Sequence, residues 1–67
     1  MQISARNQLK GTIKQVTPGA VMSEVVVDIG NHEVVAMITK ASVDRLGLKP
    51  GDAVVAIIKA TEVMIGK

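Results

Sequence analysis

Polar side chains near the start of the chain have the types and the spacing of an anion-binding group. Ser4 and Arg6 are separated by one residue, and in an extended strand residues two apart point to the same face. A hydroxyl and a guanidinium can therefore reach the same ligand, whereas Asn7 turns away from it and is expected to tie down a neighbouring loop. This block predicts one half of an anion site, with a surface ion pair of Arg6 as the simpler alternative.

Three further donors stand later in the sequence. Thr39 and Ser42 flank the start of a short predicted helix, with Thr39 as its N-cap, and free backbone N–H groups at a helix start favour anions. Lys59 ends an apolar strand, so its ammonium emerges at the strand end. Donors without matching acceptors suit a small, multiply charged oxyanion. The purely structural alternatives are helix capping by Thr39 and a solvated strand end at Lys59.

The remaining composition offers little for catalysis or for a metal ion. The six carboxylates stand beside turns or strand ends, and the single histidine, His32, follows Gly30-Asn31. No Ser-His-acid order, no phosphate-binding glycine loop and no helical metal pair can be drawn. With no cysteine and one histidine, a zinc site built from nitrogen and sulfur is excluded. We therefore expect no enzymatic activity, no bare metal ion and no organic cofactor.

The elements that must position these donors are short strands. Val, Ile and Thr make up 22 of the 67 residues, which favours strands. Gly30-Asn31 between two β-branched runs predicts a tight hairpin, and residues 40–46 followed by Gly47 predict one or two helical turns with a glycine stop. Residues 48–52 then predict a turn that leads into the next strand. The pattern predicts a single all-β domain over 1–67, a small five-stranded OB-like barrel with one short helix. The strand-forming blocks are 3–16, 21–29, 33–39, 52–60 and 62–65.

A chain of 67 residues without cysteine has few means of stabilising itself alone. Residues 24–28 and 53–58 are apolar on both strand faces instead of alternating. One small domain cannot cover both faces of two such strands, and exposed apolar surface costs about 25 cal/mol per Å². Another copy of the chain is the simplest cover, so we expect a closed symmetric homo-oligomer.

Partners of other kinds are not expected. The net charge is only +2, and the chain has no Phe, Tyr or Trp, so the stacking platforms of single-strand nucleic-acid binders are missing. The sequence begins without a signal peptide and contains no apolar run of roughly 20 residues that could cross a bilayer. We therefore expect a cytoplasmic protein that binds neither nucleic acid nor a membrane.

Four motifs occur in order along the whole chain, and together they carry a family resemblance. They are Ser4-Ala-Arg-Asn-Gln-Leu-Lys-Gly11, Ile38-Thr39-x-x-Ser42, Leu48-x-Pro-Gly-Asp-x-Val54 and Lys59-Ala-Thr-Glu62. The combination resembles the molbindins (Mop proteins), free-standing molybdate-binding domains of the TOBE type. The resemblance implies OB-like barrels assembled as a homo-hexamer, a trimer of dimers, with oxyanion sites between subunits. It implies that one chain contributes Ser4, Arg6, Lys59 and Ala60, and its neighbour Thr39 and Ser42.

Two details of this resemblance concern the sites themselves. Position 60 is a hydroxyl residue in some relatives, and Ala60 offers only its backbone N–H. Hexameric members also imply a second class of oxyanion site near the threefold axis. The candidates for its lining are Gly19, Ala20, Val21, Met22 and His32.

The function that the resemblance implies is cytoplasmic storage or buffering of molybdate and tungstate. Both are tetrahedral dianions that cannot donate a hydrogen bond at neutral pH, so a pocket of donors alone matches them. The first alternative is an OB-like nucleic-acid-binding module that uses Lys10, Lys14 and Lys40. The second is a ligand-sensing subunit that docks on another protein.

Overall fold

The computed structural model describes all residues from 1 to 67 and is built mainly from strands. A single α-helix lies between the last two strands, and a short 3-10 helix follows the last one. In chain order the elements are β1 (Asn7–Thr17), β2 (Met22–Asp28), β3 (Glu33–Thr39), α1 (Lys40–Leu46), β4 (Ala53–Ile58) and the 3-10 helix (Ala60–Glu62).

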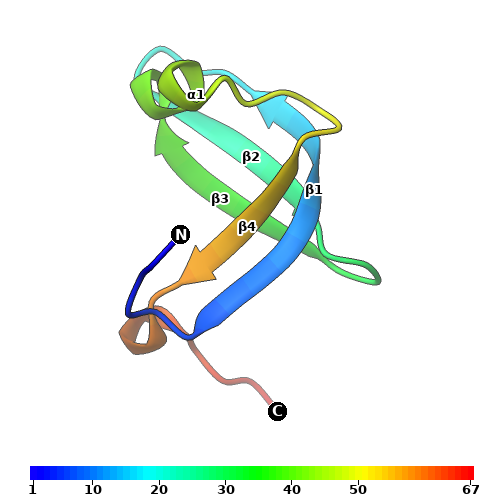
Figure 1. Ribbon diagram of the computed structural model, residues 1–67, viewed down its shortest axis with the longest axis vertical. Coiled ribbons are helices and arrows are strands. Elements are labelled where there is room, and N and C mark those ends of the chain that lie inside the picture. Colours follow the sequence, from blue (N-terminus) through cyan, green and yellow to red (C-terminus); the bar gives the residue numbers. More distant parts are fainter.

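The strands form one antiparallel sheet in the order β3-β2-β1-β4. The long strand β1 pairs with β2 on one side and with β4 on the other, and the sheet curls into a half-barrel (Figure 1). Its outer edges are β3 and β4. The helix α1 lies at one end of the half-barrel, and the N-terminal segment and the 3-10 helix lie at the opposite end (Figure 1).

The expectation of five strands is wrong, because residues 62–65 do not form one. The chain turns into the 3-10 helix after β4, and the residues beyond it leave the sheet as a tail (Figure 1). A β-branched run becomes a strand only where a neighbouring edge offers hydrogen bonds, and the tail pairs with no edge of its own chain. The first strand also starts at Asn7, so Ser4 and Arg6 precede it.

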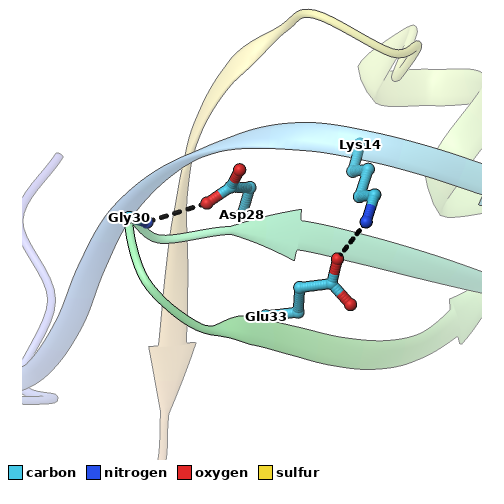
Figure 2. A network of polar contacts seen from close by, with 4 residues as sticks. All are labelled: Lys14, Asp28, Gly30 and Glu33. Atoms are coloured by element: carbon cyan, nitrogen blue, oxygen red, sulfur yellow. Dashed lines mark hydrogen bonds and ion pairs between the residues drawn. The ribbon is translucent and has the colours of Figure 1, made fainter.

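The predicted turns are confirmed. In the β2–β3 hairpin the Ile29 N–H donates to the His32 carbonyl at 2.9 Å, and Gly30 takes a φ of 117°, which favours glycine. The Gly30 N–H also donates to Asp28 Oδ1 at 2.8 Å (Figure 2). The predicted turn over 48–52 is closed by a backbone hydrogen bond across it. These local contacts fix where β2 ends and where β4 begins.

The predicted helix is confirmed together with both of its caps. Thr39 Oγ1 accepts a hydrogen bond from the Ser42 N–H at 3.0 Å, and Gly47 ends the helix in the left-handed conformation, with φ 63° and ψ 38°. Seven residues are too few for a helix that is stable alone. Burial of Val43 against the sheet therefore contributes to holding it. None of the helices has the length and apolarity needed to cross a membrane.

The core is small for the amount of apolar surface in the chain. Its fully buried apolar side chains are Ile13, Val25, Val27 and Val43. Ser23 is buried among the inward side chains of β2, and its hydroxyl has no hydrogen-bond partner. A core of this size leaves the outward faces of β3 and β4, and the C-terminal tail, without cover.

A β-bulge interrupts the pairing of β1 with β2. The register shifts between Ile13 and Gln15, which makes Lys14 the extra residue on β1. The Lys14 ammonium reaches over β2 to the carboxylate of Glu33 at the start of β3 (Figure 2). This hydrogen bond and the attraction between the two charges raise the pKa of Lys14 above its ordinary value of 10.5.

The raised pKa of Lys14 predicts a pH-dependent contribution to stability. The charged form stabilises the fold at pH values below the ordinary pKa, and this is lost as the pH rises through the raised one. Lys14→Met should therefore lower the free energy of unfolding near neutral pH, and the difference from the unmodified protein should shrink above pH 10.5. Urea unfolding followed by circular dichroism measures this, and the difference between the two proteins cancels the titration of the other lysines, which both share.

The effect should be small and sensitive to salt, because the side chains of both partners are exposed. Lys10→Met is the matched control, since Lys10 lies on the same strand and forms no ion pair. An identical pH dependence for the two variants would contradict the prediction.

Candidate oxyanion site

A hollow lies at the end of the half-barrel opposite α1, where β1 begins and β4 ends. The antiparallel pairing of Asn7 with Ile58 brings the segment before β1 beside the segment after β4. Four of the residues predicted for the first oxyanion site meet there, two from the start of the chain and two from a segment more than fifty positions later. The lining residues are Ser4, Ala5, Arg6, Asn7, Lys59, Ala60 and Thr61.

The hollow carries positive charge that the chain does not neutralise. Arg6 and Lys59 both line it, and no carboxylate does. The three ion pairs of the structure use Lys14, Lys40 and Lys49 instead. Two cations that line one hollow with no carboxylate among its lining residues favour the binding of an anion. No group of three or more His, Asp or Glu side chains is placed to hold a metal ion.

Thr39 and Ser42 lie at the other end of the molecule, at the start of α1 (Figure 1). Thr39 Oγ1 accepts from the Ser42 N–H and donates to Ser42 Oγ at 2.8 Å, so within one chain the two hydroxyls bind each other. The longest extent of the molecule is 33 Å, far beyond the reach of a single small anion. The six predicted residues are therefore split, four at one end and two at the other.

The five residues predicted for the second site do not meet within one chain either. Residues 19–21 lie in the connection between β1 and β2, beside α1, and Met22 is the first residue of β2. The Lys40 N–H donates to the Val21 carbonyl there at 2.8 Å. His32 lies in the β2–β3 hairpin, at the far end of β2. A site that uses both would need residues 19–22 from one chain and His32 from another.

Two polar residues that line the hollow were not predicted for the site. Asn7 was expected to turn away from the ligand and tie down a neighbouring loop; it lines the hollow, and its amide donates to the Ile58 carbonyl. Thr61 brings a hydroxyl next to Ala60, which has none. Asn7 and Thr61 belong to the same motifs as Arg6 and Lys59. Their closeness in sequence to the predicted site residues could have identified them.

Comparison with known proteins places the chain in a family. Residues 3–65 match the TOBE domain. The molybdenum-pterin-binding protein 3 of Clostridium pasteurianum is 48% identical over 66 residues, which are 97% of each chain. The solved structure of a molybdate-binding protein from Sporomusa ovata aligns over both whole chains, with a TM-score of 0.94 and 48% identity.

A third relative is longer than this chain. The cytoplasmic molybdate-binding protein ModG aligns with a TM-score of 0.84 and 46% identity, over 90% of this chain and 43% of that one. The family match spans nearly the entire sequence. The fold and the motifs agree with it, and Ser4, Arg6 and Lys59 line one hollow. The chain therefore belongs to the TOBE-domain family and, within it, to the molbindins.

Proposed function

We propose that this protein binds molybdate and tungstate in pockets between the subunits of a homo-hexamer, a trimer of dimers, and stores or buffers these oxyanions in the cytoplasm. The observation that carries the proposal is the meeting of Arg6 and Lys59 in one hollow without a carboxylate. A lining of donors complements a dianion that accepts hydrogen bonds and donates none. The role is binding, not catalysis, and it needs no organic cofactor.

The relatives support the ligand. The protein from Sporomusa ovata is a molybdate-binding protein, and ModG was solved with molybdate bound. The relative from Clostridium pasteurianum is described as binding molybdenum-pterin. An aromatic side chain would offer a pterin ring a stacking partner, and this chain has none. The bare oxyanion is therefore the better match to these residues.

The exposed surface supports self-association. A compact protein of this mass should expose about 4,000 Å², whereas the chain exposes 5358 Å². The excess exceeds the roughly 800 Å² per partner that a standard interface buries. Much of it is apolar, and the most exposed large apolar side chains past the first strand include Val21, Val35, Met37, Leu46, Met64 and Ile65.

The split of the predicted site supports pockets shared between subunits. Ser4, Arg6, Lys59 and Ala60 lie at one end of the chain, and Thr39 and Ser42 at the other. A neighbouring copy that presents its α1 end to this hollow would add two hydroxyl groups to the cations. On that arrangement the Thr39–Ser42 hydrogen bond rearranges to face the ligand.

The nucleic-acid-binding alternative is not favoured. Of the three lysines that it would use, Lys14 is paired with Glu33 and Lys40 with Asp44. Only Lys10 has no carboxylate partner. Binding to phosphates would have to compete with these ion pairs, and no aromatic side chain is present to stack on bases.

Native mass spectrometry tests the proposal directly. The protein is sprayed alone, with molybdate, and with sulfate as the control anion. The expected result is a particle of six times the 7.0 kDa chain mass that gains discrete molybdate masses and none from sulfate. A monomer or dimer that is indifferent to molybdate would refute both the shared pockets and the storage role. A mass gain with a short oligonucleotide at low salt would favour the alternative.

A further inference from the structure

Asn7 occupies the corner at which the N-terminal segment enters the sheet. The Gln8 N–H donates to the Arg6 carbonyl at 3.1 Å, which closes a three-residue turn centred on Asn7. The Asn7 side-chain amide then donates from Nδ2 to the Ile58 carbonyl at 3.1 Å. This bond joins two segments that are 51 positions apart in the sequence. The same residue therefore bends the chain and ties the bend to β4.

The tie lies between the two cations of the hollow. Arg6 directly precedes Asn7, and Lys59 directly follows Ile58. Both cations thus leave the backbone one residue from the atoms that the Asn7 amide holds together. The backbone pairing of Asn7 with Ile58 and this side-chain bond together hold the bases of the Arg6 and Lys59 side chains. Both side chains are exposed, and neither has an ion-pair partner in the chain.

The sheet does not need this bond to form. The pairing of β1 with β4 runs through six residue pairs, from Asn7 with Ile58 to Thr12 with Ala53. The side-chain bond is exposed and adds one contact at the end of that ladder. Removing the side-chain bond should leave β1 and β4 paired. It should loosen the end of the ladder at Asn7 and Ile58, next to Arg6 and Lys59.

We propose that Asn7 is a positioning residue of the oxyanion hollow: its amide sets the separation of Arg6 and Lys59 and thereby favours the larger oxyanion over sulfate. The inference rests on the proposed function. Molybdate and sulfate have the same shape and charge and differ in size, so they can be separated only by donor spacing. A binding constellation has to be held to within roughly 0.5 Å to keep such a preference, and a freed strand end no longer holds the donors at the spacing of the larger anion.

The experiment measures the dissociation constants for molybdate and for sulfate by calorimetry, with the melting temperature recorded for each variant. In Asn7→Ala the molybdate constant should rise about tenfold, equivalent to about 1.4 kcal/mol, because the donors are no longer held at the spacing that molybdate needs, while the sulfate constant changes little. The molybdate-over-sulfate preference should fall by the same factor. Asn7→Gln keeps the amide donor on a longer arm and should restore part of the preference.

A matched control is available on the same strand. Gln15 is an exposed amide whose Nε2 donates to Thr17 Oγ1 at the far end of β1, so Gln15→Ala should leave both constants unchanged. If Asn7→Ala weakens both anions equally, in step with a falling melting temperature, the residue is structural and the inference is refuted. An unchanged preference in Asn7→Ala while Arg6→Ala loses molybdate refutes the positioning role alone. A wild-type protein that does not bind molybdate refutes the proposed function and this inference together.

Discussion

Replacing Arg6 with Ala is expected to weaken molybdate binding by a factor of about 10 to 150, with the fold retained. A charge-assisted hydrogen bond contributes about 1.5–3 kcal/mol, which converts to that range of affinity. The side chain of Arg6 is exposed and forms no ion pair. Arg6 makes one hydrogen bond within the chain, in which its backbone carbonyl accepts from the Gln8 N–H. Ala at this position keeps that carbonyl. Titration calorimetry at fixed ionic strength measures the change.

Two further variants separate charge from geometry at Arg6. Arg6→Lys keeps the charge but loses the planar fork that can bind two oxygens at once, so its affinity should fall between that of the unmodified protein and that of Arg6→Ala. Arg45→Ala removes an equally charged, exposed side chain from the last turn of α1 and should leave the affinity within about twofold. A dissociation constant for Arg6→Ala close to that of the unmodified protein would remove Arg6 from the site.

Residue type and spacing predict only part of the arrangement of the candidate site, because each such argument works over a limited range. Spacing and residue type singled out Ser4, Arg6 and Lys59, and the structure brings them to one hollow. Thr39 was correctly expected to cap a helix, because a cap depends only on its next few residues. The position of that helix at the opposite end of the chain depends on strand order, and no local pattern encodes strand order.

The same distinction explains where the predicted fold was wrong. The hairpin at Gly30 and the glycine stop at Gly47 follow from local backbone chemistry, and both are present. Residues 62–65 have the composition of a strand but find no partner edge within the chain. Asn7 was expected to tie down a neighbouring loop, but its partner, Ile58, follows only from pairing across 51 positions. Each miss concerns hydrogen bonds between distant segments, which propensity and alternation do not determine.

Replacing Gly11 with Ala is expected to cost about 3 kcal/mol of stability, near the upper end of the usual cost of overpacking. A Cβ at Gly11 would lie 2.5 Å from the Asp28 carbonyl oxygen and 2.7 Å from Val27 Cγ1. The oxygen belongs to the backbone, so relief requires β1 and β2 to move apart. The reduced freedom of the unfolded chain offsets only about 0.4–1 kcal/mol, and the net effect is therefore destabilising.

This loss is large for so small a domain. A chain of 67 residues has a total stability of roughly 3–10 kcal/mol, and a change of about 3 kcal/mol lowers the melting temperature by roughly 12–24 °C. Gly66→Ala is the matched control, because nothing lies within 4 Å of the Cβ that it would add and its φ is not positive. Circular dichroism should show the control melting with the unmodified protein and Gly11→Ala melting far earlier. Coinciding curves for all three would mean that β1 does not approach β2 as closely as Gly11 requires.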